Sequence, residues 1–334
     1  MKFLIIKDPH SMLGFRSNYR KNGWENDMIN KHEFIINYAK ENNIKYILST
    51  GDNLDNQKQW SFKQYLYNKK LFKMYKDNNL FFASIAGNHD MLEGRENIAD
   101  SVFEDLVNED IIYYITKNPI NISESNINIK VSGKDYQYIN DKESKQNYID
   151  NIDIQDENNI NIFILHQNIT PKPERVSDFT YDELVKIGKE KNINIFICGH
   201  YHVGFGTTTI DGITIINPWN LWRVVRDYEV QLDNHKPEMV ELIIEDDIKY
   251  KHIEIPHKDY LNAFDPKLLD IFKETKMDTF NFFKAFKSDN DLLQGEEKTD
   301  IEILEIMKNT IKEKFNATDE EILKAFNEIE SKLF

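Results

Sequence analysis

The chain has 334 residues, a formal net charge of −15 and a hydrophobic fraction of 40%, so it can form one large domain and a smaller one. The acidic balance speaks against a protein that coats nucleic acid by itself. No apolar run reaches about eighteen residues, so neither a membrane span nor a membrane partner is expected. Cys198 is the single cysteine, which excludes an intramolecular disulfide and indicates a reducing cytoplasm.

The N-terminal part predicts strands that alternate with helices. Strands are expected over residues 2–7, 46–49 and 80–86, and helices over residues 27–43 and 60–79. This alternation indicates an α/β fold whose sheet contains parallel strands.

Each of these three strands ends in polar side chains. They are Asp8 and His10 after the first strand, Asp52 after the second, and Asn88, His89 and Asp90 after the third. Ligands bind at the carboxyl ends of the strands in α/β folds. One composite site is therefore expected at this edge.

The pattern continues after a helix over 98–110 and a polar, Asn-rich stretch over 116–157, which holds a strand-like segment over 127–131. A strand over 161–165 ends in His166, and a strand over 193–198 ends in His200 and His202. Between them, a helix over 180–190 begins at the capping box of Thr180 and Glu183.

The C-terminal third predicts hairpins and then helices. Two strands, 207–210 and 213–216, flank Asp211-Gly212, which suits a two-residue turn, and further strands are expected over 227–232, 239–244 and 248–255. Helices are expected over 261–286 and after capping boxes at Thr299 and Thr318. We therefore predict a domain over residues 1–257 and a helical region over 258–334, which either packs as a small bundle or presents a face to a partner.

The strand-end residues have the chemistry of metal ligands. Without His89 and Asp90, they comprise two carboxylates, one amide oxygen and four imidazoles: Asp8, His10, Asp52, Asn88, His166, His200 and His202. This mixture suits two divalent cations such as Mn²⁺, Fe²⁺ or Zn²⁺ better than Mg²⁺ or Ca²⁺. A carboxylate such as Asp52 can bridge two cations, roughly 3.5–4 Å apart, that clamp a phosphate. His89 and Asp90 are the predicted catalytic residues, with Asp90 orienting the His89 imidazole.

The series Asp8-Pro9-His10, Gly51-Asp52, Gly87-Asn88-His89-Asp90, His166 and Gly199-His200-Tyr201-His202 resembles the five motifs of calcineurin-like metallophosphoesterases. The resemblance covers about residues 1–220 and implies a β-sandwich flanked by helices. It also implies that Asp8, His10, Asp52 and His202 hold one metal, that Asp52, Asn88, His166 and His200 hold the other, and that His89 is catalytic. Lys7 departs from the family, which often has a small residue at this position.

Within the superfamily, the chain is most similar to the SbcD-type nuclease subunit of DNA repair complexes, including phage recombination endonuclease subunits. Asp55 completes a Gly-Asp-x-x-Asp form of the second motif, and residues 217–221 stand where those nucleases carry a Pro-containing turn, here without the usual Gly-Ser. The resemblance implies a hydrolase with two divalent metal ions, expected to be Mn²⁺, that acts as a DNA exonuclease and endonuclease. The implied partners are DNA, an SbcC-like coiled-coil ATPase and a second copy of the chain.

Two competing interpretations remain open at this point. The same metals would serve a phosphoesterase that acts on small molecules or phosphoproteins and not on DNA. A scaffold protein on a degenerate phosphoesterase fold is disfavoured because the ligand set is complete. The helical tail favours the nuclease, since a free-standing phosphatase has no need of an amphipathic partner-binding extension.

Overall fold

The computed structural model describes residues 1–13, 24–55, 61–92, 94–124, 127–222, 235–258 and 260–263. These residues belong to one compact unit, Met1–Pro266. The strand expected over 227–232 and the helices expected beyond residue 263 lie outside the described residues. The predicted domain division at 257/258 stays a prediction.

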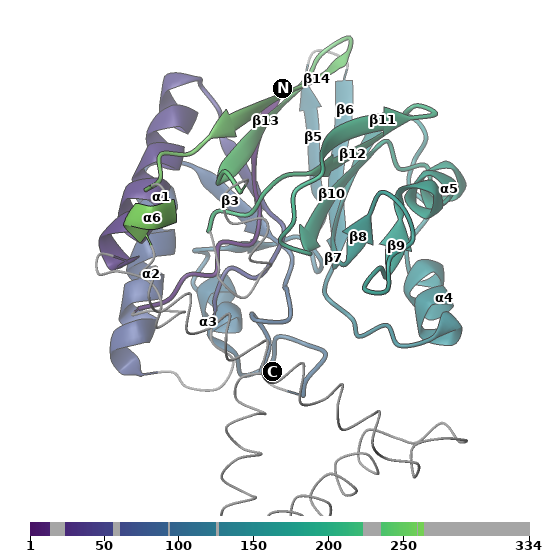
Figure 1. Ribbon diagram of the computed structural model, residues 1–334. Coiled ribbons are helices and arrows are strands. Elements are labelled where there is room, and N and C mark those ends of the chain that lie inside the picture. Colours follow the sequence, from purple (N-terminus) through teal and green to yellow (C-terminus); the bar gives the residue numbers. More distant parts are fainter. Residues whose placement is uncertain are drawn as a thin grey trace, which may run out of the picture. The chain divides into compact units, whose positions relative to one another are not determined.

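Two six-stranded sheets form the centre of this unit (Figure 1). The first sheet contains β1 (Lys2–Ile6), β2 (Tyr46–Ser49), β3 (Phe81–Ser84), β4 (Tyr113–Tyr114), β13 (Glu238–Ile244) and β14 (Ile248–Glu254), in the order β14-β13-β1-β2-β3-β4. The second contains β5 (Ile120–Glu124), β6 (Ile127–Lys134), β7 (Ile160–Gln167), β10 (Ile195–His200), β11 (Gly206–Ile210) and β12 (Ile213–Asn217), in the order β11-β12-β10-β7-β6-β5. A separate pair joins β8 (Ile169–Thr170) to β9 (Phe179–Thr180).

Both sheets are mixed. In the first, β1 to β4 run parallel, and β13 is antiparallel to β1. In the second, β6, β7, β10 and β12 run parallel, and the outer strands β5 and β11 are antiparallel to their neighbours. The parallel strands of each sheet therefore place their carboxyl ends at one edge.

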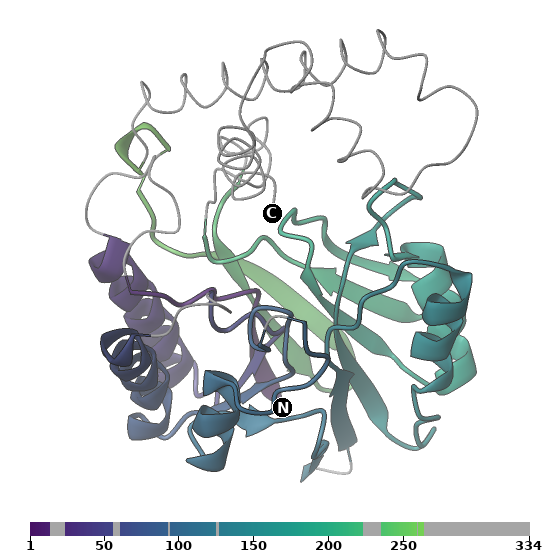
Figure 2. The ribbon, with the colours of Figure 1, turned by 90° about the horizontal axis from the view of Figure 1, so that it is seen from below.

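Helices cover the outer faces of the sheets. They are α1 (Trp24–Glu41), α2 (Phe62–Asp77), α3 (Val102–Asn108), α4 (Lys142–Asp150), α5 (Tyr181–Lys191) and α6 (Tyr260–Ala263). Figure 2 shows the layers from below, with the purple helices beside the first sheet and the teal helices beside the second. The sheets and helices thus stack as α-β-β-α, and the predicted β-sandwich flanked by helices is confirmed.

The strands alternate between two cores, because successive side chains of a strand point to opposite faces. Phe3 and Ile5 pack between the sheets, where they meet Ile164 of the second sheet. Leu4 and Ile6 pack against the helices of the first sheet. Cys198 is likewise a fully buried core residue, beneath the helices of the second sheet.

Local signals in the sequence located most of these elements. The capping box of α5 is confirmed, since the Thr180 hydroxyl accepts from the Glu183 amide and the Glu183 carboxylate accepts from the Thr180 amide. The two-residue turn is also confirmed, with φ of 50° at Asp211 and 82° at Gly212. Helix α4 was missed, because its polar sequence offers only Tyr148 as a buried residue. Among the described helices, none is long and apolar enough to cross a membrane.

Candidate metal centre

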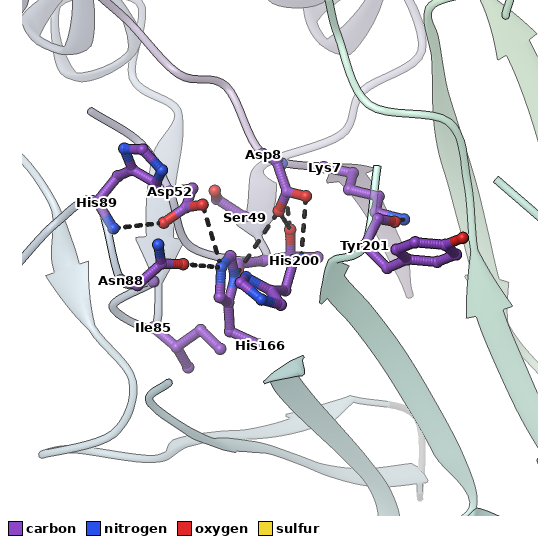
Figure 3. A network of polar contacts seen from close by, with 12 residues as sticks. Lys7, Asp8, Ser49, Asp52, Ile85, Asn88, His89, His166, His200 and Tyr201 are labelled. Carbon is purple, nitrogen blue, oxygen red and sulfur yellow. Dashed lines mark hydrogen bonds and ion pairs between the residues drawn. The ribbon is translucent and has the colours of Figure 1, made fainter. Parts of the chain in front are cut away.

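The carboxyl ends of strands from both sheets bring the predicted site residues together. Potential ligand atoms form two groups, and within each group the atoms lie within 4.8 Å of one another. One group contains His10, Asp52 and His89, and the other contains Asp52, His166 and His200. Asp52 belongs to both groups, and Figure 3 shows it between His89 and His166. The composite site expected at the strand ends is therefore present.

The remaining predicted ligands lie beside these two groups. Asn88 Oδ1 is 3.3 Å from His166 Nε2. The Asp8 carboxylate is 3.8 Å from His166 Nδ1 and 3.9 Å from His202 Nε2. His202 Nε2 is also 2.9 Å from His10 Nε2. All seven predicted metal ligands thus surround one site, although the assignment of each to a particular metal stays a prediction.

Several ligand positions have a left-handed backbone conformation that non-glycine residues rarely adopt. The φ angles are 44° at Asp8, 43° at His10, 47° at Asp52 and 76° at His200. Such residues cost on the order of 1–3 kcal/mol each and persist only where surrounding contacts hold them. Here the His10 amide donates to the Asp52 carbonyl at 2.7 Å, and the His200 amide donates to Asp8 Oδ2 at 3.0 Å. The motifs therefore hold one another in place.

Only glycine fits at position 87, because any side chain there would clash with Asp52. A Cβ atom there would lie 2.1 Å from Asp52 Oδ1, which is far inside van der Waals contact. The loop after β3 can approach the shared carboxylate because this residue has no side chain.

A hydrogen bond sets the tautomer of His166. His166 Nδ1 is 2.8 Å from the Thr50 carbonyl oxygen, which can only accept, so Nδ1 carries the proton. In its neutral form the His166 ring then presents Nε2 with its lone pair to the site, which is the orientation that a metal-ligating histidine needs. His10 Nδ1 lies 2.9 Å from Asp55 Oδ1 as an ion-pair contact.

The surroundings of His89 correct one prediction. Its Nδ1 is 3.1 Å from the Asp55 carbonyl oxygen, and its amide donates to Asp52 Oδ1 at 2.8 Å. The described residues thus place Asp55, and not Asp90, against the His89 ring. This role of Asp55 was not predicted, and the Gly-Asp-x-x-Asp spacing is the signal in the sequence that points to Asp55.

Asp90 instead joins the loops after β2 and β3. Its carboxylate accepts from the amides of Gly87, Asn53 and Leu54 at 3.0, 3.2 and 3.0 Å, and from the Asn53 side chain at 3.1 Å. Burial and repulsion from Asp52 raise the pKa of Asp90 to about 7. Asp90 therefore acts on the loop that carries Asn88 and His89, and its catalytic role stays a prediction.

Charge at the site favours a cation. Burial raises the pKa of Asp52, but attraction to His166 and His89 outweighs it and holds that pKa well below its usual range. Burial lowers the pKa of His166, and attraction to Asp52 and Asp8 more than reverses this. For His200, burial and repulsion from His166 lower the pKa, so this imidazole is neutral and able to act as a ligand.

The donor set fits two divalent cations. Carboxylates, an amide oxygen and imidazole nitrogens converge on a buried edge, and Asp52 stands where a bridging ligand is needed. Mixed nitrogen and oxygen ligands of this kind are typical of catalytic transition-metal sites. The fold and the site together define a metal-binding protein.

Comparison with protein families identifies its class. The family described as calcineurin-like phosphoesterase matches residues 1–204, more than half of the 334-residue chain. The chain belongs to this family and is a metal-dependent phosphoesterase. Comparison with curated protein sequences gave no match.

Solved structures show weaker similarity. The protein TT1561 of Thermus thermophilus is 11% identical, with 76% of this chain and 99% of that chain covered and a TM-score of 0.47. A dimetal phosphatase from Danio rerio is 11% identical, with 77% and 99% covered and a TM-score of 0.42. Vps29 from Entamoeba histolytica, complexed with zinc, is 14% identical, with 76% and 99% covered and a TM-score of 0.36.

Proposed function

We propose that this phosphoesterase is a DNA exonuclease and endonuclease that acts with an SbcC-like ATPase in DNA repair and recombination. The observation that carries the proposal is the place of Asp55. Its carboxylate lies 2.9 Å from His10 Nδ1 and its carbonyl oxygen 3.1 Å from His89 Nδ1. The Gly-Asp-x-x-Asp form of the second motif, on which the resemblance to the nucleases rests, is thus part of the site's architecture.

A second feature supports the proposal. The chain after β12 resembles the Pro-containing turn of those nucleases, and it packs on the first metal-binding motif. The Leu221 amide donates to the Lys7 carbonyl at 3.2 Å, and Trp222 Nε1 donates to the Pro9 carbonyl. The segment therefore packs against the backbone of the first metal-binding motif.

The chemistry divides between the metals and His89. When bound, two divalent cations polarise the phosphodiester and activate water for attack. Because the Asp55 carbonyl accepts from His89 Nδ1, the other ring nitrogen is the one that remains for the substrate. In its protonated form this nitrogen can donate to a phosphoryl oxygen or to the leaving oxygen. Asp52 accepts from the His89 amide at 2.8 Å and so keeps the ring beside the shared carboxylate.

The proposal extends to the metal ion, the partners and the location of the protein. Mn²⁺ is the proposed metal, and residues 258–334 are the proposed binding region for the ATPase. DNA and a second copy of the chain complete the proposed partners, and the single cysteine suggests the cytoplasm.

An assay on end-labelled duplex and single-stranded DNA with Mn²⁺ tests the substrate. We expect wild-type protein to shorten or cut the DNA, and Asp52→Ala protein to leave it intact. Bis(p-nitrophenyl) phosphate and p-nitrophenyl phosphate serve as small substrates in parallel. Hydrolysis of these small substrates without any DNA cleavage would overturn the proposal in favour of a small-molecule or phosphoprotein phosphoesterase.

A truncation tests the partner. Removing residues 288–334 should leave hydrolysis of bis(p-nitrophenyl) phosphate unchanged and abolish association with the ATPase in a pull-down. If the truncated chain still binds the ATPase, the tail is only a structural bundle.

A further inference from the structure

Lys7 is a buried lysine at the first metal-binding motif. It directly precedes Asp8, and its side chain is fully buried. Its Nζ donates to the carbonyl oxygen of Tyr201 at 2.7 Å and to Asn217 Oδ1 at 2.6 Å. Figure 3 shows Lys7 beside Tyr201. This is also the position at which the chain departs from the small residue common in its family.

These two hydrogen bonds connect the two sheets. Lys7 follows β1 of the first sheet, whereas Asn217 ends β12 of the second sheet. Tyr201 lies between His200 and His202, two predicted ligands of different metals. The backbone adds a third connection, since the Lys7 carbonyl accepts from Leu221 at 3.2 Å. One residue thus links the turn of Asp8 to the turn of the two histidines.

We propose that Lys7 is a positioning residue that sets the distance between Asp8 and the turn of His200 and His202. The His200 amide donates to Asp8 Oδ2 at 3.0 Å, and the same oxygen is 3.9 Å from His202 Nε2. Both distances span the gap between the sheets, and both Asp8 and His200 have positive φ. Such strained turns persist only where surrounding contacts hold them, and the Lys7 side chain supplies two of those contacts. The inference rests on the phosphoesterase activity of the family and does not depend on DNA being the substrate.

The sign of the effect on metal binding separates positioning from electrostatics. Lys7→Met removes both side-chain hydrogen bonds and keeps an unbranched side chain. The substitution also removes a positive charge next to Asp8. By charge alone, this removal would strengthen binding of Mn²⁺. If Lys7 positions the ligands, binding instead weakens, by about 10- to 100-fold as for other residues that orient metal ligands.

The experiment measures Mn²⁺ binding to the full chain by isothermal titration calorimetry, together with thermal unfolding. For Lys7→Met we expect weaker binding of at least one Mn²⁺ and altered electron paramagnetic resonance of the Mn²⁺ pair. His32→Leu is the matched control, because the hydrogen bond of buried His32 joins α1 to Tyr75 of α2 and touches no ligand. The control should lose stability and bind Mn²⁺ as wild type does.

Unchanged or tighter Mn²⁺ binding by folded Lys7→Met protein would overturn the proposal. If this variant does not fold, Asn217→Ala decides, because it removes one of the two acceptors and leaves Lys7 in place. We expect about 10-fold weaker Mn²⁺ binding from it, the low end of the same range, and wild-type binding would overturn the proposal. Neither result depends on whether the enzyme cleaves DNA.

Discussion

The pKa values of two fully buried histidines in this protein are shifted in opposite directions. His32 lies between α1 and α2, where its Nδ1 is 2.7 Å from the Tyr75 hydroxyl and its ring packs edge-on against Phe72 and Tyr75. Burial, with repulsion from Lys31, lowers the pKa of His32 to about 3. His166 lies at the end of β7, equally buried, and its pKa is raised by Asp52 and Asp8 in spite of burial.

The difference between the two pKa shifts shows why the carboxyl ends of the strands can form a metal site. Burial alone disfavours a charged imidazole, as it does at His32. At His166 the carboxylates that end β1 and β2 reverse the balance, so this part of the interior favours positive charge. The environment of His32 disfavours a charged imidazole, and the environment of His166 at the strand edge favours one.

Removing Asp52 is the strongest test of this comparison, because it erases the carboxylate that the two ligand groups share. We expect Asp52→Ala to lose both metals and to reduce hydrolysis of bis(p-nitrophenyl) phosphate by at least about 10⁴-fold, since each cation contributes several kcal/mol of charge stabilisation. Metal content by mass spectrometry and initial rates measure this. A variant that retains two bound metals would show that Asp52 is not the shared ligand.

Removing His89 tests a histidine that faces the same carboxylate at a partly exposed position. We expect His89→Ala to keep both metals and to lose about 10²- to 10⁴-fold in rate, the usual contribution of a positioned proton donor. Rates and metal content of the same preparation provide the measurement. Loss of one metal would make His89 a ligand, as its place in a group with His10 and Asp52 allows.

Removing the carboxylate of Asp55 tests whether this side chain orients His10 for metal binding. In Asp55→Ala protein the backbone carbonyl that contacts His89 remains, but the partner of His10 Nδ1 is lost. Mn²⁺ affinity should fall by about 10- to 100-fold, as measured by calorimetry. Asp90→Asn is the informative comparison, because Asp90 contacts backbone amides rather than a histidine ring. It should lower stability more than metal affinity, and the reverse ranking would contradict the roles assigned to both carboxylates.

The smallest effect concerns His32 and the pH dependence of stability. Because the pKa of His32 is about 3 in the folded protein against 6.5 ordinarily, the unfolded chain takes up a proton first as the pH falls. Stability should therefore fall from about pH 6 to pH 4, by at most about 1.4 kcal/mol per pH unit from this group. Urea unfolding in EDTA should show a shallower decline for His32→Leu than for wild type. Parallel declines would mean that His32 is already protonated when folded.

Local signals account for what could be predicted of the fold. Continuous apolar runs of suitable length located the strands, and the Thr180–Glu183 box located the start of α5, because these signals act between residues close in the chain. The same signals placed Asp52, Asn88 and His166 at strand ends. Helix α4 escaped because its solvent-facing sequence has almost no apolar periodicity.

The sequence by itself determined which chemical groups end each strand, and this was enough to predict a metal site. Only the tertiary structure decided which groups face one another. It paired Asp55 with His10, turned Asp90 toward backbone amides, and brought Lys7 to Tyr201 and Asn217. Such contacts depend on how two sheets pack across many intervening residues, and no local pattern encodes that packing. The residues at the strand ends therefore determine the chemistry of the metal site, and the packing of the two sheets determines its geometry.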